Sequence, residues 1–210
     1  YNLTQRKDYA VSKTFTDRIT NDPRKTVFAT SQVGFPYGLT RDNAVSFANA
    51  NSNYAVILAN SNRTESSPLV IIGAANMWLA RSEAAFRGWT SEDKTITYNM
   101  GVQRSMEFWG VYSATAYATY IAANPATDLQ AIATQEWISW YPNGMEGWNT
   151  WRRTGYPTLT PAAGTPAIPR RFPYGSNEYN LNPTNVGAAA ALYTVGGVSD
   201  SQFARIWWDQ

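Results

Sequence analysis

The sequence predicts a mainly α-helical fold, in which tetratricopeptide-like helix pairs are followed by a long irregular C-terminal wrap. Apolar residues recur at helical spacing in two paired stretches, within 69–108 and 129–154. Each stretch reads as helix, short turn and helix, and a unit of roughly 34 to 40 residues has the dimensions of a tetratricopeptide repeat. Prolines at 157, 161, 166, 169 and 173 then favour an extended path with little regular structure.

The later helix pair has the clearest pattern. Either Thr127 or Asp128 can cap its first helix. Pro142-Asn143-Gly144 should end that helix, because proline disfavours helical geometry in the residue before it. The second helix should run from about 145 to the Gly155-Tyr156-Pro157 stop. The apolar stripe of the first helix consists of Leu129, Ile132, Ala133, Glu136, Trp137, Trp140 and Tyr141.

Tryptophans line the facing sides of this hairpin, and an arginine pair closes it. The stretch 135–157 holds Trp137, Trp140, Trp148 and Trp151. Aromatic stripes at helical spacing are typical of packed cores. Arg152 and Arg153 are expected to hold carboxylates or helix ends of the protein itself rather than a ligand.

The earlier helix pair is predicted over 69–86 and from a capping box at 90–93 to about 108. Gly88 should stop the first helix, and Thr90-Ser91-Glu92-Asp93 offers a capping box, with Thr90 as cap, for the second. A further helix is expected at 114–123. The side of the first helix expected to meet a neighbour carries small alanines that allow close approach, and consists of Ala74, Met77, Trp78, Arg81, Ala84 and Ala85.

The first sixty residues mix a helix, a turn and a loop. An untidy helical pattern runs through 1–20, from Leu3 to Ile19, and 21–24 (Asn-Asp-Pro-Arg) ends it. The Asp22 side chain can bond the backbone ahead of it, so Asp22 and Arg24 are interpreted as structural. Residues 31–53 are expected to form a loop, followed by a strand-like run at 54–59.

Two pairs of aromatic residues are candidate ligand-binding residues. Phe35 and Tyr37 stand between glycines and a proline in the 31–53 loop, where their rings could form a platform for a sugar. The alternative is that they plug the loop onto the body of the protein. Trp109 and Tyr112 are second candidates, with core packing as the alternative.

Composition excludes several classes of chemistry. With 44% hydrophobic, 14% aromatic and 15% charged residues, the chain suits a globular domain that is rich in aromatics and poor in charge. Cysteine and histidine are absent, which removes thiolate metal sites, disulfides, Ser-His-Asp and Cys-His arrangements and HExxH-type zinc sites. We therefore expect no catalytic residue, metal or cofactor. The net charge of +2, without a basic run, does not indicate nucleic-acid binding.

Five sequence motifs, in order, resemble the SusD/RagB family of Bacteroidetes. They are NDPR at 21–24, WLARSEAAFRGW at 78–89, RRTGYP at 152–157, PRRFPYGSNEYNLN at 169–182 and IWWD at 206–209. The resemblance covers nearly the whole chain and is nearest to the shorter SusD-like branch. In the family the proline-rich segment wraps back over the helical body, and Glu178 and Asn182 belong to its motif.

The resemblance implies a function and a location. Family members are surface lipoproteins of the outer membrane that bind glycan without catalysis and deliver oligosaccharide to a SusC-like TonB-dependent transporter. They are about twice as long as this chain, so residues 1–210 would be the C-terminal part of one SusD-like domain. The N-terminal half and the lipid anchor, the one membrane attachment, would lie outside it.

Two other functions remain open. A glycoside hydrolase would require two carboxylates at defined separation, and Glu136 and Glu146 straddle the later hairpin. Pairing of these glutamates with Arg152, Arg153 or Arg81 is the structural alternative. A tetratricopeptide adaptor that binds a protein in a helical groove would leave the proline-rich segment unexplained.

At the C-terminus, 187–194 should be helical, and Trp207 and Trp208 should be packed against the protein.

Overall fold

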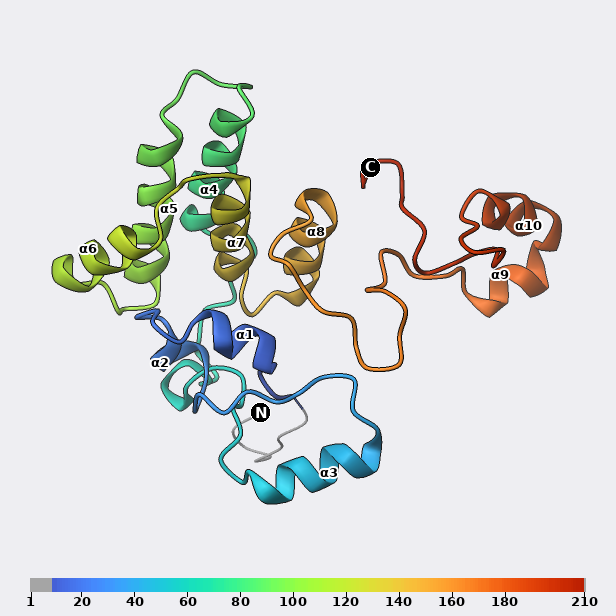
Figure 1. The fold of residues 1–210 in the computed structure, drawn as a ribbon, viewed down its shortest axis with the longest axis horizontal. Helices are drawn as coiled ribbons and strands as arrows, with labels where there is room; N and C mark the ends of the chain where they lie inside the picture. The colour runs from blue at the N-terminus through green and yellow to red at the C-terminus, as the bar shows by residue number, and fades with distance from the viewer. Residues whose placement is uncertain (1–8, 210) are drawn as a thin grey trace. The chain divides into compact units, whose positions relative to one another are not determined.

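The computed structural model describes residues 9–209 and shows a chain of two compact units, 1–157 and 158–210. Helices are the main regular structure of the described residues in both units, which confirms the mainly α prediction (Figure 1). None of the helices in the described residues is long and apolar enough to cross a membrane. The assignment of 1–210 to one SusD-like domain stays a prediction, as does its C-terminal place in that domain.

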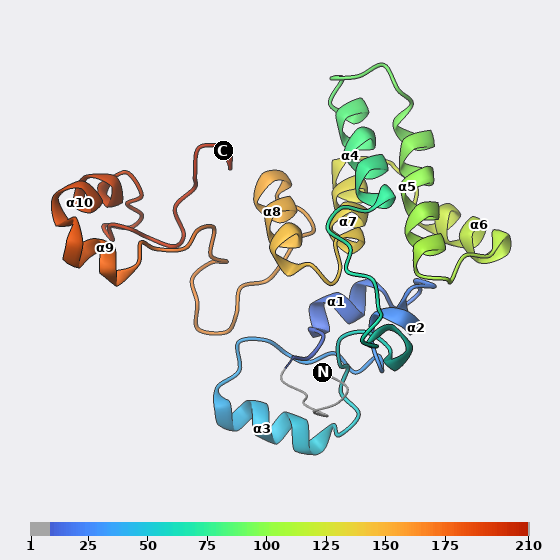
Figure 2. The same cartoon turned by 180° about the vertical axis from the view of Figure 1, so that it is seen from behind.

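The first unit carries most of the helices. They are α1 (Lys13–Arg18), α2 (Lys25–Phe28), α3 (Arg41–Ala50), the 3-10 turn η1 (Asn60–Asn62), α4 (Ala74–Phe86), α5 (Lys94–Phe108), α6 (Ala114–Ala123), α7 (Leu129–Ser139) and α8 (Gly144–Thr154). Helices α4, α5 and α7 run side by side, and α8 packs on α7 (Figures 1 and 2). Both predicted helix pairs are therefore present, with α6 between them.

The core of this helical layer lies where α4, α5, α6 and α7 meet. Leu79, Val102 and Ile132 are fully buried there, together with Met106. A Cβ at Gly101 would stand 2.6 Å from Cγ of Leu79, so α4 and α5 approach more closely than any side chain at 101 permits.

Helix ends follow local chemistry. Asp128 caps α7 and Gly155 ends α8, as predicted; Gly155 does so in a left-handed conformation, and Asn143, predicted only as part of the stop between the helices, also caps α8. The α5 cap differs from prediction. Asp93, rather than Thr90, accepts the backbone N–H groups of Thr95 and Ile96, because its carboxylate sits at the residue before the first helical turn.

The first helix of the earlier pair was predicted with the wrong start and the wrong buried face. It begins at Ala74 rather than 69, where Asn76 accepts a bond from the N–H of Gly73. Its buried residues are Ala75, Asn76, Leu79, Ser82 and Glu83. These lie opposite the predicted stripe, since helical residues turn by about 100° each. Polar groups on neighbouring helices pair with the polar residues of this buried face. The spacing of apolar residues in the sequence does not reveal these pairings.

The N-terminal part of the unit forms a second core. Phe15, Ile19 and Phe28 are buried with Ile138 of α7, and Trp137 and Tyr141 pack against them. Isolated β-bridges join Ala10 with Val56 and Ala29 with Ile57, so the predicted 54–59 strand is reduced to single bridges. The helix predicted over 1–20 is present as α1, whereas Leu3 lies outside the described residues.

The region predicted as a loop, 31–53, contains helix α3. Thr40 caps it by accepting the N–H of Asn43. Its residues are half-buried or exposed, with little apolar patterning to mark a helix in the sequence. Phe47 projects from it onto Phe35, with ring centroids 4.7 Å apart. That aromatic contact joins the helix to the segment before it.

The second unit contains α9 (Ser176–Leu181) and α10 (Pro183–Ala191). Residues 155–175 are irregular, as their prolines predict, and α10 ends before the predicted 194. Arg170 pairs with buried Asp209, its Nε lying 2.6 Å from Oδ2. Trp207 is 83% exposed, so the prediction that it packs against the protein is wrong for the described structure. The charge pair of its neighbour Asp209 holds the chain end instead.

Candidate functional site

The predicted pair Phe35 and Tyr37 lies on the segment leading into α3. Phe35 is half-buried: its backbone N–H donates to Val11 O at 2.8 Å, and its ring meets Phe47 and Tyr54. Tyr37 is 42% exposed. The backbone and ring contacts position Phe35 firmly, and Tyr37 presents a phenol ring at the surface beside it in the chain.

The second pair lies at the end of α5. Trp109 is half-buried, with its ring edge-on to Phe28 at 5.2 Å and to Phe108 at 5.1 Å. Tyr112 is exposed and stands 5.7 Å from Tyr117. Phe35, Trp109 and Tyr112 therefore contact three different sets of rings, and Trp109 and Tyr112 do not share a ring partner among these contacts. Their ligand-binding role stays a prediction.

A surface hollow that sequence reasoning missed lies between the 21–24 turn and α6. Its volume is about 470 Å³, and it is lined by Asn21, Pro23, Ala116, Thr119, Tyr120, Ala123 and Asn124. Short alanines on α6 leave the space, and amide and hydroxyl groups border it. The NDPR motif supplies Asn21 and Pro23 to the lining of the hollow. The local sequence pattern does not predict that α6 lies on the opposite side.

Buried Arg24 donates a hydrogen bond to Tyr120, one of the residues that line this hollow. Its Nε and Nη2 donate to both carboxylate oxygens of Asp22, at 2.9 and 2.6 Å. Further bonds reach Ser105 on α5 and Gln135 on α7, each at 2.9 Å, and Tyr120 on α6 at 3.3 Å. The interpretation of Asp22 and Arg24 as structural is confirmed, because the pair joins three helices.

In this network Arg24 is charged, whereas the phenol of Tyr120 is neutral. Burial alone would lower the pKa of Arg24, but the carboxylate of Asp22 outweighs it and the pKa is raised. Burial also raises the pKa of the Tyr120 phenol to about 12. Arg24 therefore stays protonated, and Tyr120 stays a neutral hydroxyl that accepts from Arg24 and from Gln135.

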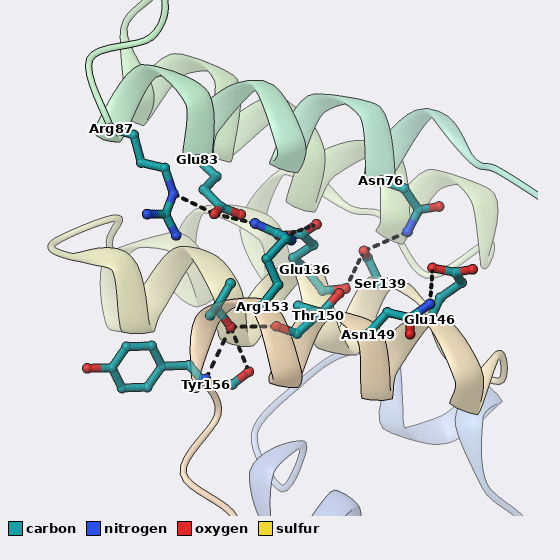
Figure 3. Close-up of polar contacts among 11 residues, drawn as sticks. Asn76, Glu83, Arg87, Glu136, Ser139, Glu146, Asn149, Thr150, Arg153 and Tyr156 are labelled. Atoms are coloured by element: carbon teal, nitrogen blue, oxygen red, sulfur yellow. Dashed lines mark hydrogen bonds and ion pairs between the residues drawn. The ribbon is translucent and has the colours of Figure 1, made fainter. Parts of the chain in front are cut away.

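A second charge cluster, in which two buried glutamates pair with partly exposed arginines, connects α4, α7 and α8 (Figure 3). Arg153 donates to both oxygens of Glu136 at 3.1 Å and to Glu83, and Arg87 donates to Glu83 at 2.7 Å. The predicted carboxylate-binding role of Arg153 is thus confirmed. Arg152 differs, since it stacks over the Trp148 ring at 3.7 Å and donates to Asn149.

Burial separates the pKa values of the two glutamates. Burial raises the pKa of Glu136 to about 7, aided by the neighbouring Glu83 carboxylate and opposed by Arg153. Burial would also raise the pKa of Glu83, but its bonds with Arg153 and Arg87 outweigh this and hold it below the ordinary value. The group that gains or loses a proton near neutral pH is therefore Glu136, in a cluster that joins three helices.

Glu136 and Glu146, the pair on which a hydrolase would depend, have different partners. Glu136 is buried against Arg153, whereas Glu146 accepts a bond from Asn149 at 3.3 Å, apart from the cluster in Figure 3. This arrangement gives no support to paired acid–base catalysis. Across residues 9–209, no three acidic, histidine or cysteine side chains gather where they could hold a metal ion.

The helix pairs and the buried Asp22–Arg24 pair define a mainly α-helical protein with tetratricopeptide-like helix pairs. A SusD-like family model, described as "Starch-binding associating with outer membrane", matches residues 1–175. The chain belongs to this family, whose members associate with the outer membrane. The resemblance expected from the five sequence motifs is thereby confirmed.

Solved structures agree on the fold. A chitin-binding protein is 26% identical, with a TM-score of 0.77 over 95% of this chain and 50% of its own. A SusD homologue from Bacteroides thetaiotaomicron is 24% identical, with a TM-score of 0.79 over 96% of this chain and 52% of its own. A homologue from Bacteroides vulgatus is 26% identical, with a TM-score of 0.70 over 94% and 48%.

These matches also fix the relative length of the chain. It spans about half the length of the solved structures that it matches. No curated protein matches the sequence. The family and the fold are therefore established for these residues, whereas the activity and partners of a family-length protein are matters for proposal.

Proposed function

We propose that this protein binds an oligosaccharide nutrient at the outer-membrane surface and does so without catalysis. The observation that carries the proposal is the family match over residues 1–175, whose description names starch binding and the outer membrane. A chitin-binding protein among the similar structures supports a glycan ligand. Glucose polymers and N-acetylglucosamine polymers are thus the first two ligand classes to test.

The finer proposal is delivery of the bound oligosaccharide to a SusC-like TonB-dependent transporter. It rests on the resemblance to the SusD/RagB family, as does a lipid anchor outside this chain. Residues 1–210 would then form the C-terminal part of a surface lipoprotein. Co-purification of a large barrel protein with the native protein from its source membrane would support this, and a protein purified alone in mild detergent would contradict it.

Tyr37 is the residue best placed to stack on a sugar ring. It is 42% exposed, and it is adjacent in the chain to Pro36 and near the anchored Phe35. An exposed phenol combines a flat apolar face with a hydroxyl that can bond a sugar hydroxyl. Phe35 supports the segment, and Tyr112, 39% exposed, is the corresponding residue of the second pair.

The test is calorimetric titration of the native protein with maltohexaose and with chitohexaose. Tyr37→Ala should weaken binding of the recognised sugar by about 1 kcal/mol or more, roughly fivefold in Kd, because a stacking face is removed. Trp89→Ala is the matched control, since Trp89 is an exposed aromatic on the α4–α5 turn. The same comparison applies to Tyr112→Ala.

The outcomes separate the site from the function. Sugar binding that survives all four substitutions at 35, 37, 109 and 112 would retain the function and reject this site. Shortened oligosaccharide after incubation would reinstate the hydrolase. Failure of every tested glycan to bind, together with capture of a protein partner, would favour the tetratricopeptide adaptor.

A further inference from the structure

One side of helix α6 opens onto the hollow beside the 21–24 turn. The helix lies next to the turn that precedes α2 in both views (Figures 1 and 2). Its residues in the lining, which share one side of the helix, are Ala116, Thr119, Tyr120 and Ala123. The volume of about 470 Å³ falls in the lower half of the range of small-molecule sites. The hollow is therefore large enough for a ligand of one or two rings.

Both walls of the hollow are fixed by hydrogen bonds within the protein. In the turn, the Asp22 carboxylate accepts the backbone N–H of Arg24 at 2.9 Å. On α6, the Tyr120 hydroxyl accepts a bond from Arg24 at 3.3 Å. At the end of α6, the Tyr98 hydroxyl donates to the backbone oxygen of Asn124 at 2.7 Å. A preformed site of this kind loses little conformational entropy when a ligand binds.

The lining of the hollow is uncharged. Asparagine, proline, alanine, threonine and tyrosine make up the lining, and the pKa of Tyr120 is raised to about 12 by burial. The charged residues next to it in the chain, Asp22 and Arg24, pair with each other, with Nη2 and Oδ2 2.6 Å apart. A charged ligand would lose hydration there without gaining an opposite charge in the lining. The lining therefore favours an uncharged ligand.

Apolar surface and hydrogen-bonding groups alternate around the hollow. The methyl groups of Ala116 and Ala123 and the ring of Pro23 are apolar. Within residues 9–209, nothing bonds to the side-chain amide of Asn21 or the hydroxyl of Thr119, and both side chains are exposed. A sugar ring presents C–H groups on its faces and hydroxyls at its edge, and each hydroxyl can donate and accept. The groups of the hollow thus match those of a sugar.

We propose that this hollow binds an uncharged sugar of one or two rings, as a second site separate from Tyr37 and Tyr112. Neither tyrosine belongs to its lining. The sugar class rests on the proposed function, whereas the position of the site and the absence of charge on its ligand rest on the lining residues. The site binds a disaccharide whether or not a longer glycan stacks on Tyr37.

Methyl NMR of the native protein, with labelled alanines, tests the position of the site. Titration with maltose or with N,N′-diacetylchitobiose should shift the signals of Ala116 and Ala123. The signal of Ala85 on α4 should stay in place, since Ala85 is not in the lining. Glucose and glucuronate are the matched pair for ligand charge, and glucuronate should cause no shift.

Variants on α6 test the contribution of the space and of the hydroxyl. Ala123→Leu should weaken disaccharide binding by roughly tenfold or more, because the larger side chain fills the hollow. Ala122→Leu is the matched control, since Ala122 is the exposed neighbour on the same helix and lies outside the lining. Thr119→Val removes a hydroxyl at nearly constant shape and should weaken binding by roughly fivefold. Circular dichroism checks that each variant is folded.

Maltohexaose and chitohexaose separate this inference from the proposed function. Disaccharide binding that is lost in Ala123→Leu, while hexasaccharide binding still depends on Tyr37, would support a second site. Hexasaccharide binding with no disaccharide-induced shift at Ala116 or Ala123 would overturn the hollow as a site and leave the function standing. Equal weakening by Ala122→Leu and Ala123→Leu, or a glucuronate shift as large as that with glucose, would also overturn the inference.

Discussion

At the residue scale, the interior of this protein is organised by buried charges that satisfy one another. Arg24 is entirely buried and Asp22 is 1% exposed, yet the pair is joined through bonds to Ser105, Gln135 and Tyr120. Buried ion pairs are poor sources of net stability, but removing one partner leaves the other uncompensated. The pair thus acts mainly by specifying how α5, α6 and α7 meet the N-terminal turn.

Replacing Arg24 tests this description. Arg24→Ala should lower the free energy of unfolding by about 3 to 5 kcal/mol, because the carboxylate of Asp22 is left buried without its partner. Urea unfolding followed by circular dichroism measures the change. Arg104→Ala is the control, since Arg104 forms an exposed pair with Glu107 and should cost less than about 1 kcal/mol. Equal losses in the two variants would contradict the assigned role.

The proton on Glu136 predicts a pH dependence of stability. Its pKa is raised from the ordinary 4.5 to about 7 in the folded protein, so the native state binds more protons than the unfolded state between these values. The stabilising contribution of the protonated form is complete below about pH 4.5 and is lost as pH rises through about 7. A shift of this size corresponds to a loss on the order of 3 kcal/mol.

Glu136→Gln is the variant that isolates this effect. Glutamine can keep a bond from Arg153 and donate to Glu83, but it has no proton to lose. Urea unfolding at a series of pH values from 4.5 to 8 should show a flatter dependence in the variant than in the parent protein. An unchanged slope would mean that another group titrates in this range.

At the scale of elements, close approach of α4 and α5 depends on a glycine. A Cβ at Gly101 would meet Leu79 at 2.6 Å and the carbonyl oxygen of Ala75 at 3.3 Å. Gly101→Ala should therefore destabilise the protein by about 1 to 3 kcal/mol through overpacking, despite the better helix propensity of alanine. Thermal unfolding followed by circular dichroism measures the effect.

Gly144 offers the matched control for Gly101. It is the first residue of α8, and a Cβ there would have nothing within 4 Å. Gly144→Ala should leave stability unchanged or raise it by less than about 1 kcal/mol. If Gly101→Ala were also neutral or stabilising, the two helices would be free to move apart and the close approach would not be a constraint.

At the scale of the whole molecule, the chain is two compact units with separate means of holding their irregular segments. In 158–210, Asp200 accepts bonds from Arg171 at 2.6 Å and from the Tyr179 hydroxyl at 2.8 Å. Arg170 pairs with Asp209 near the end of the chain. In 158–210, charge pairs and aromatic contacts hold the chain, whereas the helical layer of the first unit has a continuous apolar core.

Membership of the SusD-like family relates this architecture to that of longer proteins. The chain spans about half the length of its structural relatives. The exposed Tyr37 and Tyr112 are the residues that we propose for ligand contact, and the sugar titrations test them.

The sequence by itself determined the helices with strong local signals and the family. Spacing and end signals placed α7 and α8 to within a few residues, because Asp128 and Gly155 act within one helical turn. Five short motifs were sufficient to indicate the SusD-like family. The structural role of Asp22 and Arg24 was also predictable, since the carboxylate of an Asp before proline can accept a backbone N–H ahead of it, here that of Arg24.

Tertiary structure alone decided which faces are covered. Helix α4 carries apolar residues on two sides, and its buried side was settled by polar contacts such as Asn76 with Ser139 and Glu83 with Arg153. Helix α3 is joined by the Phe47–Phe35 contact to the segment before it, and the hollow beside α6 exists only because the 21–24 turn lies opposite. Burial depends on neighbours supplied from elsewhere in the chain, which a local pattern does not contain.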